Sequence, residues 1–445
     1  MFVLKKGFII LLSVLCFSFC VATQSWGELD WDSGAFTQEI IVPDNLIPAS
    51  NNKVSLGSSV AISDKYLIVA AKLDSQISDR GGAAFIYEYM AGKWVLVKKI
   101  APAETGEGDY VGIAVTLADE YAFASALNHK VDENHKDLGI VYVYQRKTAG
   151  EWEQTQKLIP DLSEDTHHFG SSLAVCNNHV IVGAYGKRSE TGKAFIFERE
   201  NNQWILRQTL IPDETDILGI FGGRFGADVD ISDNYAIVGT GLGFDGIGAF
   251  YIYKKQNNSW EKMTLVQNIH ETKMAYFGKT VAINDQYAVV GAYGENTDAG
   301  VVYVYRLNGD SWELITELVP SDVIAEDNFG VSIDLDGNIL AVGAKKHDWG
   351  EENSNYGAVY IFRIENESCT LLDKIKARNF MTEDYFGNAV SINDDNKTIV
   401  IGTDSGISNL GFYFIKPFSP FGLDGVLGLE DVIHWLQVLS GNPSR

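Results

Sequence analysis

Cysteine is scarce in this 445-residue chain, and the scarcity excludes a fold held together by disulfides. Of the four cysteines, Cys16 and Cys20 lie inside an N-terminal apolar run. The other two, Cys176 and Cys369, fall in the third and sixth of the sequence repeats described below, too far apart around a ring to be bridged. We therefore expect both to be free thiols packed in the core.

Basic residues are also few. The chain has 35 lysines and arginines against 59 aspartates and glutamates, which gives a formal net charge of -24. Such a surface repels phosphate backbones and anionic lipids, so nucleic acid is excluded as a partner.

Long apolar runs are absent beyond the N-terminus. The run GFIILLSVLCFSFCVA follows Lys5 and Lys6 and is typical of a signal peptide over residues 1–22, with cleavage after Ala22 or Gly27. Its removal takes two lysines and no acids, so the formal charge becomes -26. No later run approaches the roughly 20 apolar residues of a membrane span. The sequence thus predicts a secreted, extracellular or cell-surface protein with no membrane span in the mature chain.

Local signatures of catalysis and metal binding are missing too. The chain has no G-x-S-x-G elbow, phosphate loop or dinucleotide fingerprint, and no H-x-H, HExxH or paired-cysteine spacing. No cofactor is predicted. We expect solvated loop positions for seven of the eight histidines: His129, His135, His167, His168, His179, His270 and His347. An active site gathered from separate parts of a chain leaves no local signature, so an enzyme is disfavoured without being excluded.

What the sequence does contain is a repeat, shown most clearly by the unit Phe277–Pro320. Two apolar strands, TVAI and YAVVGA, flank the polar turn Asn284-Asp285, as in a tight hairpin. A polar stretch, GENTDAG, leads to the β-branched and aromatic run VVYVYR, and Trp312 opens a fourth strand, WELITELVP. Four short strands make one small sheet that is marginal alone in water, so it must pack on its siblings.

Three markers recur in order along the chain. An apolar residue followed by glycine opens each unit, at spacings of 55, 58, 56, 52, 52 and 57 residues: Leu56, Val111, Phe169, Phe225, Phe277, Phe329 and Phe386. The next strand ends as in VGAY, and a further glycine starts the third strand: Gly82, Gly139, Gly192, Gly248, Gly300, Gly357 and Gly411. Trp94, Trp152, Trp204, Trp260 and Trp312 mark the fourth strand. Glycine weakens a strand interior, so its return at equivalent places predicts a positive φ or a close approach there.

The seventh unit has no fourth strand of its own. Residues 35–45, AFTQEIIVPDN, match the fourth-strand ends QKLIPD and QTLIPD of earlier units. An N-terminal strand that completes the last sheet would remove the open edge. The sequence therefore predicts an all-β, seven-bladed β-propeller of four-stranded antiparallel blades over residues 35–417, closed by its N-terminal strand.

These three markers resemble FG-GAP repeats, as in the seven-bladed propeller of integrin α chains and many bacterial surface proteins. The resemblance covers about residues 35–417. Integrin-type blades carry a calcium loop, D-x-D-x-D-G-x-x-D, between their first two strands, and the corresponding turns here are too short for it. Asp334 and Asp336 in DLDGN look like a fragment of such a loop, but a hairpin turn is the favoured interpretation.

The polar loops between second and third strands are long, and strand alternation puts them at the same end of the ring as the links between blades. By analogy with the propellers that the chain resembles, this end is the expected binding surface. Within the links, Asp109, Asp327 and Asp384 stand two residues before a unit-opening marker. They could ring a central channel and hold a cation, but side chains bonding their own turn are favoured.

After Pro417 the pattern changes to helical periodicity, in GLEDVIHWLQVLSG. With LDG before it, the segment 418–445 resembles one half of a dockerin, which implies a cohesin-like receptor as partner. Asp424 and Asp431 are its candidate Ca²⁺ ligands, although Pro420 and Gly422 stand where two further ligands would be. The alternative is a short helix that caps the propeller.

Three functions remain open on the sequence alone. The first is a non-enzymatic binding or adhesion module that recognises protein or glycan through the long-loop face. The alternative is an extracellular polysaccharide-active enzyme or accessory subunit on the same scaffold, and the third is a structural surface element.

Overall fold

The computed structural model describes residues 37–41 and 54–415, with gaps at 92, 119, 133–134, 136, 148–149, 163–165, 188–190, 213–223, 243–245, 351–353, 377–381, 394–397 and 405–409. The segment from Thr37 onward forms one compact unit, and this unit is the one described below. The expected signal peptide and the dockerin-like segment, including Asp424 and Asp431, lie outside the described residues.

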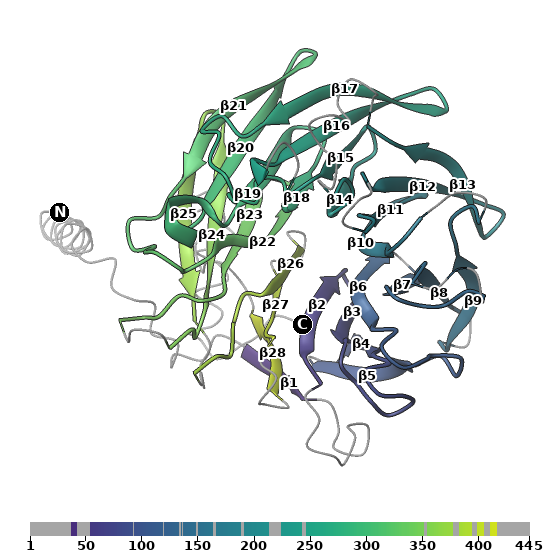
Figure 1. Cartoon of the computed structure of the whole chain (residues 1–445). Coiled ribbons are helices and arrows are strands. Elements are labelled where there is room, and N and C mark those ends of the chain that lie inside the picture. The colour runs from purple at the N-terminus through teal and green to yellow at the C-terminus, as the bar shows by residue number, and fades with distance from the viewer. Residues whose placement is uncertain are drawn as a thin grey trace, which may run out of the picture. The chain divides into compact units, whose positions relative to one another are not determined.

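Seven four-stranded antiparallel sheets make up this unit. The first strands of the sheets lie next to one another in the order β2, β6, β10, β14, β18, β22, β26 and back to β2. Figure 1 shows these strands around the centre and the fourth strands at the periphery. The expected class, an all-β propeller with four-stranded antiparallel blades, is confirmed.

Each blade takes its strands in chain order, apart from the last. Blade 1 consists of β2 (Leu56–Ile62), β3 (Tyr66–Ala71), β4 (Ala83–Met90) and β5 (Lys93–Ile100), and blade 2 of β6 (Val111–Ala118), β7 (Tyr121–Ala126), β8 (Ile140–Arg146) and β9 (Trp152–Leu158). Blade 3 consists of β10 (Phe169–Cys176), β11 (His179–Ala184), β12 (Lys193–Glu200) and β13 (Gln203–Leu210), and blade 4 of β14 (Asp228–Ile231), β15 (Tyr235–Gly239), β16 (Ala249–Gln256) and β17 (Ser259–Gln267). Blade 5 consists of β18 (Thr280–Ile283), β19 (Tyr287–Ala292), β20 (Val301–Asn308) and β21 (Ser311–Leu318), and blade 6 of β22 (Phe329–Asp336), β23 (Ile339–Ala344), β24 (Ala358–Glu365) and β25 (Ser368–Ile375). Blade 7 consists of β26 (Ala389–Asn393), β27 (Thr398–Gly402), β28 (Leu410–Ile415) and β1 (Thr37–Ile41).

The last blade joins the two ends of the ring. Strand β1 pairs antiparallel with β28, with Thr37 opposite Ile415 and Glu39 opposite Tyr413. The N-terminal strand therefore supplies the fourth strand that the seventh unit lacks, as its likeness to the other fourth-strand ends predicted.

The unit Phe277–Pro320 folds close to its predicted limits. TVAI and YAVVGA are β18 and β19, and the turn at Asn284 connects them. The polar stretch GENTDAG contains a compact turn, α4 (Glu295–Asp298), in which Asn296 and Thr297 have left-handed backbone angles and Glu295 is buried. The tryptophan lies one residue inside β21, which begins at Ser311.

The hydrophobic core lies between neighbouring sheets, not within one. Every residue of the second strands β3, β7, β11, β19 and β23 is buried, because each has a strand on both sides and a sheet on both faces. One core cluster joins Ile68 and Ile86 of blade 1 to Tyr142 of blade 2, and the other clusters bridge successive pairs in the same way. A blade removed from its neighbours would expose both faces of this core, so the ring is one cooperative unit.

The repeated glycines lie where adjacent blades touch. Gly357, which precedes the third strand of blade 6, has a φ of +87°, and a Cβ there would lie 2.0 Å from the carbonyl oxygen of Phe386 in blade 7. Gly343, on the second strand of the same blade, would place a Cβ 2.0 Å from the oxygen of Gly387. Both expected reasons for glycine, a positive φ and a close approach, are confirmed.

Side chains also connect the blades at their edges. The amide of Gln208 in β13 donates to the carbonyl oxygen of Trp260 at 2.7 Å and accepts from its backbone N–H at 2.8 Å. Gln156 in β9 holds Trp204 of the next blade in the same way, at 2.7 and 2.9 Å. These paired bonds satisfy backbone groups on the next blade that no strand partner reaches.

The two cysteines are free, as expected. Cys369 lies opposite Ile364, in the register position that Trp312 holds opposite Leu307 in blade 5. Both thiols are partly exposed, so the expectation of buried core positions is corrected to half-buried ones.

Candidate functional site

The long loops and the links between blades lie at one end of the ring, as strand alternation predicted. The backbone N–H of Asn328, in the link before blade 6, donates to the oxygen of Asp298 in the loop of blade 5 at 2.9 Å. Tyr385 donates to Asn355 in the same way one blade later, at 3.2 Å. We call this end of the ring the loop face.

A repeated backbone turn fixes the side chains of the loop face. The residue before each unit-opening marker has a φ between 47° and 62° in all seven blades, although none of the seven is glycine: Ser55, Tyr110, His168, Arg224, Tyr276, Asn328 and Tyr385. This left-handed conformation is rare for large side chains and costs roughly 1–2 kcal/mol per residue. The ring thus holds these side chains, five of them large, in fixed positions where each link enters its first strand.

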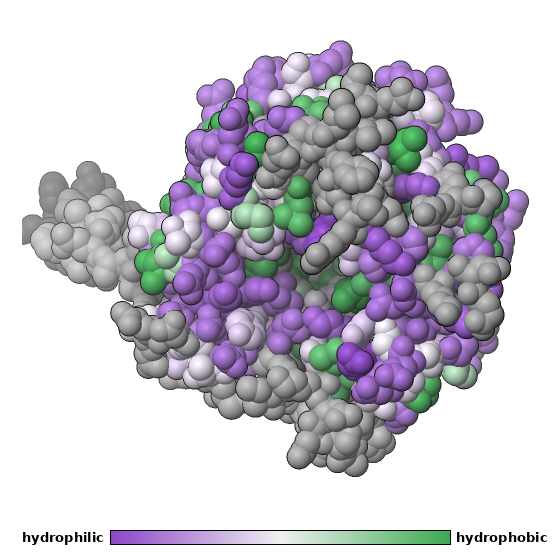
Figure 2. Space-filling view, in the orientation of Figure 1, coloured by the Kyte–Doolittle hydropathy of each residue, from purple (hydrophilic) through white to green (hydrophobic). Residues whose placement is uncertain are grey.

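The first strands of all seven blades enclose a central cavity of about 690 Å³. Figure 2 shows one face of the ring, where the described surface is mostly hydrophilic around a central hollow. Lys279, Tyr293 and Lys345 line this cavity beside the unit-opening glycines and the ends of the second strands, at its opening on the loop face. With their neighbours they form a group that we call the channel mouth: His168, Tyr185, Arg224, Tyr276, Lys279, Tyr293 and Lys345.

Aromatic rings of the channel mouth are packed face to face or under a cation. Tyr276 and Tyr293 are stacked, with ring centroids 4.8 Å apart and planes 10° apart. The Arg224 guanidinium lies 5.4 Å from the ring centroid of Tyr185, and His168 contacts the same ring at 4.8 Å. Burial raises the pKa of Tyr293 to about 12, so its hydroxyl stays protonated and can donate a hydrogen bond at neutral pH.

Two lysines of the channel mouth form no ion pair with any residue that the structure describes. Burial lowers the pKa of Lys279 and of Lys345. Within the described residues, the only polar contact of the Lys279 ammonium is the Ala227 oxygen at 3.5 Å, and that of Lys345 is the Asn388 side-chain oxygen at 3.4 Å. Both contacts are long for a charged donor, which normally lies 2.7–2.9 Å or so from its acceptor.

The wall of the channel is acidic below this opening. Asp228 and Asp230 of β14 accept backbone N–H bonds from Val281 and Ile283 of the next blade, at 2.9 and 2.7 Å. Asp334 of β22 accepts from Ile392 at 2.7 Å. Desolvation raises the pKa of Asp230 to about 8, and those of Asp228 and Asp334 to about 6. These carboxyls therefore connect first strands to one another, at an electrostatic cost.

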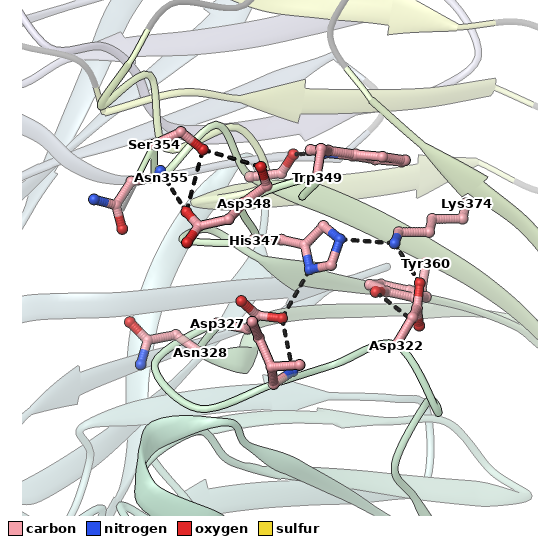
Figure 3. Close-up of polar contacts among 12 residues, drawn as sticks. Asp322, Asp327, Asn328, His347, Asp348, Trp349, Ser354, Asn355, Tyr360 and Lys374 are labelled. Atoms are coloured by element: carbon pink, nitrogen blue, oxygen red, sulfur yellow. Dashed lines mark hydrogen bonds and ion pairs between the residues drawn. The ribbon is translucent and has the colours of Figure 1, made fainter. Parts of the chain in front are cut away.

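A second polar cluster lies inside blade 6 (Figure 3). His347, almost fully buried, lies between Asp327 and Lys374: its Nδ1 is 2.7 Å from the Asp327 carboxylate and its Nε2 is 2.8 Å from the Lys374 ammonium. Lys374 also contacts Asp322, and its ammonium lies 4.2 Å from the ring centroid of Trp349. Because the Lys374 ammonium donates to Nε2, Nδ1 carries the ring proton that is donated to Asp327.

Blade 2 repeats most of this arrangement, which indicates a structural role. His129 Nδ1 is 2.6 Å from Asp109, and Lys157 pairs with Glu104 at 2.5 Å beside Tyr142. Asp109 and Asp327 also accept backbone N–H bonds from the turns three residues before them, at 2.8 and 2.9 Å. The favoured interpretation of these carboxylates as turn residues is confirmed, and Asp109, Asp327 and Asp384 do not line the central cavity.

Two expectations about candidate residues can now be judged. Solvated positions are wrong for His129, His179 and His347, whose side chains are largely buried. His129 and His347 lie in the loops that follow β7 and β23, and His179 is the first residue of β11. Asp334 and Asp336 lie at a hairpin between β22 and β23, as favoured. Within the described ranges no group of three or more His, Cys, Asp or Glu residues could hold a metal ion.

The channel-mouth residues were not singled out from the sequence. Their signal is the difference between blades at columns that flank the markers. Lys279 follows the unit-opening glycine, where other units have Ser58 or Ala227, and Tyr276 precedes the unit-opening Phe277. A blade-by-blade alignment of those columns would have drawn attention to them.

Comparison with known proteins identifies the repeat. A family model described as FG-GAP repeat matches residues 152–197, 271–305 and 312–362. The chain therefore carries FG-GAP repeats in a β-propeller. A search of curated proteins finds no match.

Solved structures match this chain at low sequence identity. A protein from Lactobacillus plantarum is 14% identical, with a TM-score of 0.49 over 76% of this chain and 89% of that one. A periplasmic gluconolactonase from Pseudomonas aeruginosa is 12% identical, with a TM-score of 0.49 over 73% of this chain and 86% of that one. In the described part of the chain, no helix has the length and apolar character needed to cross a bilayer.

Proposed function

From FG-GAP repeats in a β-propeller, we propose that this protein is a secreted or cell-surface binding module without enzymatic activity, which recognises glycan or protein through its loop face. The channel mouth is the binding site. Ligand pockets are concave and lined by aromatic side chains with a few placed polar groups, and the mouth has this composition.

One observation carries the proposal. Tyr276 and Tyr293 are half-buried and stacked in parallel at the opening of the channel, and the turn that positions Tyr276 is strained. Strain that recurs at one end of a scaffold is a mark of functional sites, where pre-organised side chains reduce the entropy lost on binding. Tyrosine suits this role because a rigid ring and a hydroxyl offer large contact area with few torsions to fix.

The experiment is a glycan and protein array probed with the mature protein and with the double variant Tyr276→Ala/Tyr293→Ala. We expect specific binding that falls at least tenfold in the variant, because the flat aromatic surface is lost. Tyr89→Ala is the matched control: Tyr89 is 45% exposed near the tight turn of blade 1, at the opposite end of the ring, and its loss should leave binding unchanged. Binding that survives the double variant would place the site elsewhere.

The same array distinguishes the other functions. It is run with and without Ca²⁺, because the dockerin-like segment retains Asp424 and Asp431 as candidate ligands. Cleavage of an array sugar would favour the polysaccharide-active enzyme over a binding module. A cohesin-like receptor on the array would test the C-terminal segment as the docking element.

A further inference from the structure

We propose that the ligand of the channel mouth is an acidic oligosaccharide, whose carboxylate or sulfate group sits between the ammonium groups of Lys279 and Lys345. This inference rests on the proposed function, since it names the ligand class of the same site. It starts from the two lysines, which the binding argument above did not use.

The first step is the missing counter-charge. Charged side chains that leave water are normally paired, because unpaired burial costs several kcal/mol per ion. Lys279 and Lys345 are half-buried at a cavity, yet neither forms an ion pair with a described residue. They line the same cavity, Lys279 just before the first strand of blade 5 and Lys345 just after the second strand of blade 6. Two like charges on the wall of one cavity, with no ion-pair partner among the described residues, indicate a site that an anion completes.

The second step is an internal comparison between blades. Lys72 is the first residue after the second strand of blade 1, the position that Lys345 holds in blade 6. Lys72 is neutralised by Asp404, at 2.9 Å. The same position is therefore paired in one blade and, among the described residues, unpaired in another, so an anionic group can be accommodated at this level of the ring.

The third step concerns the other charges around the pair. Arg224, Lys72 and Lys346 add positive charge, whereas Asp228 and Asp404 act on the lysines from beyond ion-pair distance. Deeper in the channel the Asp334 carboxylate is ionised at neutral pH, so an anion is attracted at the opening and repelled further in. This positive charge is local to the channel mouth, because the whole chain has a formal net charge of -24. A general attraction of the protein for anions therefore does not account for anion binding at this site.

The fourth step separates a sugar from an acidic peptide. The charge pair lies beside flat tyrosine faces, with Tyr293 lining the same cavity as both lysines. A pyranose ring that bears an anionic group presents one apolar face and one charge, which fits an aromatic face next to an ammonium. A polyglutamate segment offers charges on flexible stems and nothing flat to stack.

The test uses isothermal titration calorimetry on the full mature chain with four probes: a tetrasaccharide of galacturonic acid, a sulfated tetrasaccharide, a neutral cello-tetraose and a polyglutamate peptide of equal charge. We expect binding of an acidic oligosaccharide that weakens with added salt and falls at least tenfold in Lys279→Met/Lys345→Met. The uronate and sulfate arms identify the anionic group. Lys65→Met, an exposed lysine in the opposite-end turn of blade 1, removes one charge as control and should not change the affinity.

A thermal melt separates binding from structural roles. Methionine keeps the apolar stem and removes an unpaired buried charge, so we expect the melting temperature of the unliganded double variant to stay equal or rise. A structural pair of lysines would instead melt lower when replaced, and that result overturns the inference. Single variants give the same readout should the double variant misfold.

The other outcomes are equally decisive. The acidic-sugar inference is overturned if cello-tetraose binds with equal affinity or if polyglutamate binds more tightly. The proposed binding module still stands in that case, provided that binding depends on Tyr276 and Tyr293. Failure of every array ligand to depend on those tyrosines overturns the proposed function itself.

Discussion

Single residues of the channel wall make the stability of the ring depend on pH. Asp230 sits in the wall of the channel, where desolvation, opposed by the N–H of Ile283 and reinforced by the charges of Asp334 and Asp228, raises its pKa to about 8. A carboxyl whose folded pKa lies above its unfolded value holds more protons in the folded state. The free energy of unfolding therefore falls as pH rises from about 4, the unfolded pKa, to about 8.

The variant Asp230→Asn tests this dependence. Asparagine keeps the acceptor for the Ile283 N–H and cannot ionise, so the decrease in melting temperature between pH 4 and pH 8 should shrink, by on the order of a few degrees. Differential scanning calorimetry at both pH values measures it. Glu107→Gln, an exposed carboxyl in the link before blade 2, should keep the wild-type slope. An unchanged slope in Asp230→Asn would show that the carboxyl is not protonated in the folded state.

Residue patterns predicted backbone geometry better than they predicted side-chain roles. The markers at Phe277 and Gly300 specified a close approach between blades because only glycine tolerates it, and that constraint is visible in one chain. The burial of His347 was missed, because its partners Asp327 and Lys374 lie 20 and 27 residues away and meet it only through the register of a folded blade. The role of a charged residue such as Lys345 depends on its neighbours in the folded structure, which the sequence does not show.

At the level of strands and sheets, side chains on the fourth strand tie each blade to the next. Gln208 and Gln156 occupy equivalent places in β13 and β9 and bind the backbone of the following blade's tryptophan with the same two hydrogen bonds. The motifs QTLIPD and QKLIPD therefore have a physical reason beyond their strand pattern.

Replacing Gln208 by alanine should destabilise the ring by about 1–3 kcal/mol, because the N–H and C=O of Trp260 lose partners in a half-buried seam. Urea unfolding measures the change in the free energy of unfolding. Gln203→Ala, on an exposed part of the same strand with one long bond to Asn202, is the matched control and should change little. Equal effects of the two variants would attribute the lost stability to strand propensity and not to the hydrogen bonds between Gln208 and the Trp260 backbone.

On the scale of the whole molecule, closure by β1 makes the ends of the chain interdependent. The four register pairs between β1 and β28 supply the outermost strand of blade 7. The open edge that would otherwise remain is a site for unintended strand pairing.

Deleting residues 35–43 should lower the melting temperature of the entire ring in one transition, by about 5 °C, since each lost backbone hydrogen bond contributes roughly 0.5–1.5 kcal/mol. A chain lacking only residues 1–34 is the control and keeps β1. Circular dichroism melts compare the two. A truncated ring as stable as the control, or one that loses blade 7 in a separate early transition, would contradict a single cooperative closure.

The pairing of β1 with β28 also sets an order of events during synthesis. The strand made first, Thr37–Ile41, finds its partner only after Ile415 has been made, so the nascent chain carries an unmatched segment through the growth of every other blade. Chains that await distant partners fold slowly and are exposed to misassociation in the interval. A cell that makes this protein must therefore shield its earliest segment until the latest one arrives.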